Sequence, residues 1–166
     1  MTFKSIILGL TLLNFSSYIG AKNTAEESIW WGVSAGQINI FRETELKNNL
    51  YGLELRFKSV TKWNLVPSVG YKWGDSGFNY LYSDLRYPFE IGENWLLNIN
   101  SGIGVYDESN VFDLGHEIEF RSGFEIIYKL DERQRLGFSA NHYSNSRLAD
   151  RNPGTESVSL IYLHMF

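Results

Sequence analysis

The chain has 166 residues, with 15 Lys and Arg against 19 Asp and Glu, and therefore a formal net charge of −4. This acidic balance argues against nucleic acid as a partner, because binding to phosphates needs a basic surface. There are no cysteines, which excludes thiolate metal sites, catalytic thiols and disulfides. The three histidines, His116, His142 and His164, lack the spacing of metal ligands, so neither a metal nor another cofactor is expected.

Residues 1–21 have the pattern of a secretory signal peptide. Lys4 precedes an apolar run at 6–13, and small residues end the segment at Ala21. The run is far shorter than the roughly 20 residues that a transmembrane helix needs, which disfavours the alternative of a membrane anchor. We expect cleavage after Ala21, which leaves residues 22–166 as one domain with a net charge of −5, the −4 of the chain less the +1 of Lys4.

The rest of the chain alternates between apolar and polar residues with a period of two, which is the pattern of β-strands. In the clearest segment Leu53 and Leu55 share one face, and Glu54 and Arg56 share the other. Another segment contains Pro67, a residue that normally belongs at a strand edge or bulge. No helix is predicted. In chain order the predicted strands are 28–40, 50–58, 63–73, 78–87, 95–105, 116–128, 134–144 and 156–166.

The two faces of these strands differ in a way that favours a transmembrane barrel. An aromatic content of 16% with only 43% hydrophobic residues suits strands in which alternate residues meet lipid. Trp63, Trp73 and Trp95 fall near strand ends on the apolar face, where an aromatic girdle would lie. The alternative is a soluble barrel of the lipocalin kind, which would turn the apolar face inward. The opposite face carries a charge load better suited to the polar interior of a small membrane barrel, namely Glu54, Arg56, Lys72, Asp84, Arg86, Glu117, Glu119, Arg121 and Glu125.

The connections between the predicted strands alternate in length, and only the one at 74–77 breaks the alternation. The short ones are 59–62, 88–93 and 129–133, and the longer ones are 41–49, 106–115 and 145–155. With an even number of strands, the short turns and both termini lie on the periplasmic side and the long loops face outside. The sequence thus predicts an all-β protein, an eight-stranded antiparallel transmembrane β-barrel of the bacterial outer membrane. The terminal Phe166, with Tyr162 and Leu160 in register, resembles the signal that such barrels present to the barrel assembly machinery.

Three polar residues, His142, Ser144 and Glu156, occupy positions on the apolar face of the last two strands. Residues two apart share a face, so their neighbours there include Phe138 and Leu160. A polar group on such a face is unfavourable as packing. In an antiparallel hairpin the three side chains would meet on one patch. A histidine, a serine and a carboxylate are the groups that a hydrolase needs to split an ester.

The run His142-Tyr143-Ser144-Asn145, followed by Asn152-Pro153-Gly154-Thr155-Glu156-Ser157, resembles the signature of the lipid A 3-O-deacylase family of the PagL type. Leu114-Gly115-His116 and Phe120-Arg121 extend the resemblance upstream, so that it covers roughly the last 55 residues. The resemblance implies an outer-membrane enzyme built as an eight-stranded barrel that needs no metal.

The same resemblance implies roles for individual residues. His142, Ser144 and Glu156 would form the catalytic triad, and Asn145 and Asn152 would lie near the oxyanion. Family members often have small residues after this asparagine, whereas here Ser146 and Arg147 follow. Arg147 and Arg151 are candidates to bind the phosphorylated sugars of the lipid, and their alternative role is that of ordinary solvated loop charges.

The expected function is therefore that of a serine esterase that removes the ester-linked 3-hydroxyacyl chain at position 3 of lipid A. The lipopolysaccharide would be reached from the outer leaflet, within the lipid of the outer membrane. Two alternatives remain open at this point: a non-enzymatic small barrel that serves as an adhesin or structural protein, and a lipid A acyltransferase. The sequence leaves open the preferred chain length and whether two copies form a homodimer.

Overall fold

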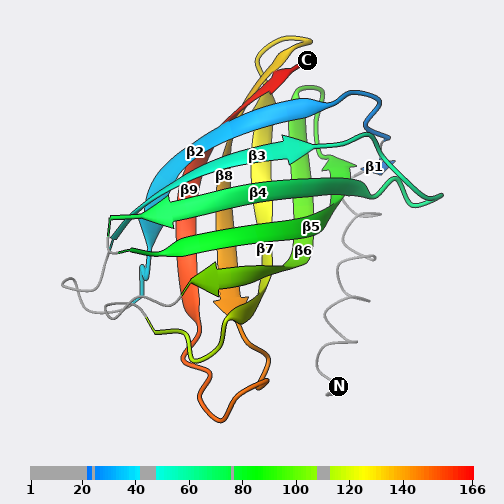
Figure 1. The fold of residues 1–166 in the computed structure, drawn as a ribbon. Helices are drawn as coiled ribbons and strands as arrows, with labels where there is room; N and C mark the ends of the chain where they lie inside the picture. Colours follow the sequence, from blue (N-terminus) through cyan, green and yellow to red (C-terminus); the bar gives the residue numbers. More distant parts are fainter. Residues whose placement is uncertain (1–21, 24, 42–47, 76, 108–112) are drawn as a thin grey trace.

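The computed structural model describes residues 22–23, 25–41, 48–75, 77–107 and 113–166 (Figure 1). The predicted signal peptide, 1–21, lies outside the described residues. The strands are β1 (Lys22–Asn23), β2 (Trp30–Ile38), β3 (Asn48–Arg56), β4 (Val66–Gly74), β5 (Asn79–Glu90), β6 (Trp95–Asp107), β7 (Ile118–Lys129), β8 (Gln134–Ser144) and β9 (Thr155–Met165).

Strands β2 to β9 form one closed antiparallel barrel. Each of them pairs with the next in the chain, and β2 pairs with β9 to close the ring, with Trp30 opposite Met165 and Ile38 opposite Ser157. The short β1 pairs with the end of β5. The predicted eight-stranded antiparallel barrel is therefore confirmed, and Figure 1 shows its strands wrapped around a single axis. Among the described residues, no helix is long and apolar enough to cross a membrane.

The barrel is apolar outside and polar inside. Leu53, Leu81 and Leu160 are more than half exposed on the outer wall, whereas Arg86 and Glu125 are buried in the lumen. A lipocalin-like barrel would show the reverse, so the polar interior predicted from the strand patterns is confirmed. One member of the predicted inner face differs, because Glu117 lies just before β7 and is exposed.

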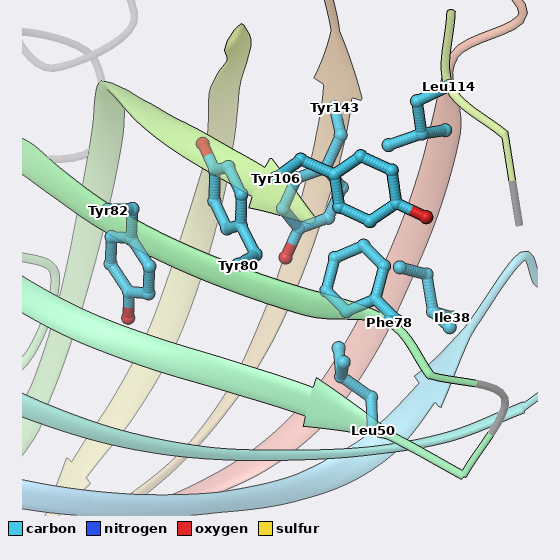
Figure 2. Close-up of a cluster of buried hydrophobic side chains, with 8 residues drawn as sticks. All are labelled: Ile38, Leu50, Phe78, Tyr80, Tyr82, Tyr106, Leu114 and Tyr143. Atoms are coloured by element: carbon cyan, nitrogen blue, oxygen red, sulfur yellow. The ribbon is translucent and has the colours of Figure 1, made fainter. Parts of the chain in front are cut away.

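The lumen is filled by three layers along the strand direction. An aromatic cluster lies toward the loop between β8 and β9, and Figure 2 shows the ring of Phe78 among its other members. Its residues are Ile38, Leu50, Phe78, Tyr80, Tyr82, Tyr106, Leu114 and Tyr143. A second apolar cluster lies toward the chain terminus and contains Trp30, Leu96, Ile127, Ile161 and Leu163.

Between the two clusters lies a buried ionic layer centred on Arg86. This guanidinium contacts Glu54 at 2.8 Å, Asp84 at 2.5 Å and Glu125 at 3.3 Å. Arg56 joins Glu54 to Glu125 at 2.5 and 2.9 Å, and Arg121 pairs with Asp84. The ionic layer ties β3, β5 and β7 together across the lumen.

Two prolines lie inside strands, at places where the pairing of one neighbour has already ended. The β3–β4 ladder stops at Arg56 opposite Ser68, and Pro67 is the next residue out. The β4–β5 ladder stops at Val66 opposite Arg86, and Pro88 lies beyond it. Because proline has no backbone N–H to donate, these strand margins are the positions that tolerate it.

The prediction for the start of β4 was wrong. Trp63 was expected to open this strand, but it lies in a turn that is closed by an isolated bridge between Val60 and Leu65. Thr61 and Asn64 in this turn have φ values of 68° and 54°, which a strand does not allow. The connection between β3 and β4 therefore runs over 57–65, which is longer than the predicted 59–62.

Candidate active site

His142 and Glu156 are directly opposite each other in the β8–β9 ladder. The Nδ1 atom of His142 lies 3.1 Å from Oε1 of Glu156, and the two side chains are 48% and 33% exposed. His142 lies on the same face of β8 as Phe138, which is 42% exposed, whereas the next residue, Tyr143, is buried in the lumen. The pair therefore lies on the outer wall. Because a carboxylate accepts hydrogen bonds, this contact puts the imidazole proton on Nδ1 and leaves Nε2 as an acceptor.

Ser144 is the last residue of β8 and lies on the same face as His142, two residues further along. The β8–β9 register ends with Tyr143 opposite Thr155, so that the next pair out would be Ser144 opposite Gly154. Ser144 is half-buried. In the part of the chain that the structure describes, no hydrogen bond joins its hydroxyl to the imidazole. The predicted role of Ser144 as nucleophile therefore stays a prediction.

Gly154 makes room for the imidazole at this end of the hairpin. A Cβ atom at this position would lie 3.2 Å from Cε1 and 3.7 Å from Nε2 of His142. The edge of the ring that carries the accepting nitrogen therefore faces Gly154, the residue opposite Ser144. The φ of Gly154 is 62°, a value that favours glycine. The sequence patterns assigned no role to Gly154, although a Pro-Gly pair directly before a strand marks a backbone position of this kind.

The two asparagines hold the loop between β8 and β9. Asn145 is fully buried, and its Nδ2 donates to the carbonyls of Arg151 at 2.7 Å and Leu114 at 3.2 Å. Its backbone N–H donates to Oδ1 of Asn152 at 3.0 Å, and its Oδ1 accepts from the backbone N–H of Arg147 at 2.9 Å. The side chain of Asn145 is thus engaged in the loop, which begins directly after Ser144. Its predicted position beside an oxyanion stays a prediction.

The residues that follow Asn145 form a tight turn. Leu148 N–H donates to the carbonyl of Asn145 at 3.0 Å, and Ser146 and Arg147 have φ values of 52° and 66°. These are the features of a type I′ turn, which here contains two non-glycine residues. The turn leaves the side chain of Arg147 exposed at the edge of the site. Arg151, the other predicted headgroup ligand, pairs with Asp113 at 2.6 Å.

The loop between β6 and β7 supports the loop between β8 and β9. Leu114 is buried in the aromatic cluster and accepts the hydrogen bond from Asn145. Gly115, with φ of 85°, lies so close to Arg151 that a Cβ would be 2.6 Å from its carbonyl oxygen. This contact between Leu114-Gly115 and the loop between β8 and β9 gives a physical reason for a motif that lies about 30 residues upstream of His142 in the sequence.

Comparison with known proteins identifies the family. Residues 28–164 match the family model of the lipid A 3-O-deacylase (PagL), which is more than half of the chain. A lipid A deacylase PagL from Bordetella bronchiseptica is 23% identical over 132 residues, which cover 68% of this chain and 74% of that protein.

Two solved structures share the fold. The crystal structure of the outer membrane enzyme PagL has a TM-score of 0.63 at 23% identity and covers 81% of this chain and 98% of its own. The N-terminal β-barrel domain of OprF from Pseudomonas aeruginosa has a TM-score of 0.62 at 12% identity and covers 86% of this chain and 100% of its own. The chain is an outer-membrane-type β-barrel that belongs to the PagL family of lipid A 3-O-deacylases.

Proposed function

We propose that this protein hydrolyses the ester that links a 3-hydroxyacyl chain to position 3 of lipid A, with Ser144 as nucleophile, His142 as general base and Glu156 as its partner. The observation that carries the proposal is the 3.1 Å contact between His142 and Glu156 on the outer wall. A histidine and a carboxylate that face the hydrocarbon of a membrane have no packing reason to be there. Membership of the family supports the same substrate.

The first half of the reaction would transfer the acyl chain to the enzyme. Nε2 of His142 removes the proton from the Ser144 hydroxyl while Oγ attacks the carbonyl carbon of the ester. The carbonyl oxygen becomes an oxyanion, and Glu156 stabilises the imidazolium. When the intermediate collapses, the bond between the carbonyl carbon and the sugar oxygen breaks. The imidazolium returns its proton to that oxygen, and the acyl chain remains on Ser144.

The second half would release the fatty acid. A water molecule loses a proton to His142 and attacks the acyl carbon, and the bond to Ser144 Oγ then breaks as this oxygen regains the proton. The oxyanion that forms in both halves needs hydrogen-bond donors. We assign them to the exposed side chain of Asn152 and to backbone N–H groups of the loop, because Asn145 already donates to two carbonyls.

The position of the triad favours action from the outer leaflet. Ser144 ends β8 and Glu156 lies at the start of β9, at the end of the barrel opposite the terminal Phe166 (Figure 1). In outer-membrane barrels with an even number of strands the termini face the periplasm, so that this end faces outward. Arg147, exposed at the same end, is suited to bind a phosphate of the lipid.

The test is mass spectrometry of lipid A from cells that express the protein or its Ser144→Ala form. We expect the wild-type protein to remove the mass of one hydroxyacyl chain and the variant to leave lipid A unchanged. A gain in mass would instead indicate the acyltransferase. Unchanged lipid A with wild-type protein in the outer membrane would contradict the proposal and favour the non-enzymatic barrel.

A further inference from the structure

Ser122 lies on the other side of His142 from Glu156. It is the direct partner of His142 in the β7–β8 ladder, so that Glu156, His142 and Ser122 form one row across β9, β8 and β7. Directly opposed side chains of neighbouring strands are about 4.5 to 5.5 Å apart at Cβ. Ser122 is exposed on the outer wall, between Phe120 and Phe124, which are 37% and 41% exposed.

The hydroxyl of Ser122 is available to a ligand. Within the described ranges no hydrogen bond of this hydroxyl to the protein is found, whereas Ser83, another serine with outward parity, donates to the carbonyl of Ser68 at 3.2 Å. A hydroxyl that faces hydrocarbon without a partner is unfavourable. A substrate with a polar group at this level of the wall would satisfy it.

The geometry disfavours Ser122 as a second nucleophile. The edge of the imidazole that carries Nε2 lies 3.7 Å from the Cβ position of Gly154, on the β9 side of the ring. Ser122 lies on β7, on the opposite side. The proton acceptor therefore faces the end of the hairpin where Ser144 lies.

We propose that Ser122 positions the substrate by donating its hydroxyl to the carbonyl oxygen of the acyl linkage next to the one that is cleaved. This inference rests on the proposed function, since it requires a lipid with at least two acyl chains attached side by side. The cleaved chain would lie at Ser144 and His142, and its neighbour would lie over β7. The hydrocarbon of this neighbouring chain would run along the wall past Phe124, in the direction away from the loop between β8 and β9.

The test compares the steady-state kinetics of the wild-type protein with those of its variants, each as the purified full-length barrel, on lipid A in detergent micelles. Ser122→Ala should raise KM about three- to ten-fold, the effect of losing one hydrogen bond, and should change kcat less than about two-fold. Ser122→Thr keeps the hydroxyl and should restore KM. The matched control is Ser101→Ala, because Ser101 is exposed on the same wall but lies one strand further from the imidazole, opposite Ser122.

An unchanged KM in Ser122→Ala, or an equal rise in Ser101→Ala, would overturn the inference. A loss of kcat as large as that of Ser144→Ala would also overturn it, because Ser122 would then be part of the reacting machinery. Binding of lipid A to Ser144→Ala with and without Ser122→Ala, followed by tryptophan fluorescence, is a readout that does not depend on turnover. If the wild-type protein proves inactive on lipid A, the proposed function fails, and a weaker binding in the double variant would still support the role of Ser122.

Discussion

At Gly154 the addition of a single methyl group should have a large effect on catalysis. Its missing side chain leaves the space into which the edge of the His142 ring fits, and its φ of 62° is unfavourable for other residues by about 1 to 2 kcal/mol. In Gly154→Ala a methyl group 3.2 Å from Cε1 should turn the imidazole away from Ser144. We expect kcat to fall about ten-fold or more with a smaller change in KM, measured on lipid A in micelles.

Gly92→Ala is the matched control for this change. Gly92 lies in the turn between β5 and β6, and a Cβ there would make ordinary contacts of 3.6 and 3.7 Å with Trp95. Its kcat should equal that of the wild-type protein. If Gly154→Ala were as active as Gly92→Ala, the accepting nitrogen would not depend on the space at Gly154, and our placement of the imidazole edge would be wrong.

Glu156 is expected to support catalysis through its charge and through the hydrogen bond that it accepts from Nδ1 of His142. In Glu156→Gln the side chain keeps its length, but its amide can also donate to Nδ1 of His142. This stabilises the tautomer that is protonated on Nε2, which cannot accept a proton from Ser144. In an unrelated serine hydrolase the corresponding change lowers kcat about 10⁴-fold, and since His142 is half-exposed here we expect a loss of about ten-fold to 10⁴-fold. KM should change little. Activity equal to that of the wild-type protein would show that the 3.1 Å contact has no catalytic role.

At the scale of elements, the loop between β8 and β9 depends on Asn145. This buried side chain donates to the carbonyls of Leu114 and Arg151, and Asn145→Ala would leave both without this donor. Unsatisfied buried groups destabilise by about 1 to 3 kcal/mol. We expect faster hydrogen exchange in 145–154 together with lower kcat. A lower kcat with unchanged exchange would instead mean that Asn145 acts directly at the oxyanion.

The strands and their faces could be predicted from the sequence because a period of two is a local property. Phe138, His142 and Glu156 are on the outer wall as their parity predicts. The conformation of Asn64 could not be predicted, since the alternation of the predicted strand 63–73 runs through this residue, which takes a positive φ in the folded chain. The need for a small residue at Gly154 could not be predicted either, because it depends on the side chain of His142 from the neighbouring strand.

At the scale of the whole molecule, the ionic layer should contribute to the stability of the closed barrel. Arg86, which is 1% exposed, faces Glu54, Asp84 and Glu125 at once. In Arg86→Ala these carboxylates lose their shared cation, and removing one partner of a buried ion pair typically destabilises by about 3 to 5 kcal/mol. We expect a lower midpoint of urea unfolding for the barrel reconstituted in vesicles.

The control is Arg151→Ala, which breaks an ion pair whose side chains are 70% and 45% exposed. Exposed pairs contribute about 0 to 1 kcal/mol, so its unfolding midpoint should stay close to that of the wild-type protein. Below its own midpoint, Arg86→Ala should keep the strands paired, because the two apolar clusters on either side of the ionic layer remain. Equal midpoints for the two variants would mean that water enters the lumen and screens the charges, and the ionic layer would then contribute no more than a surface pair.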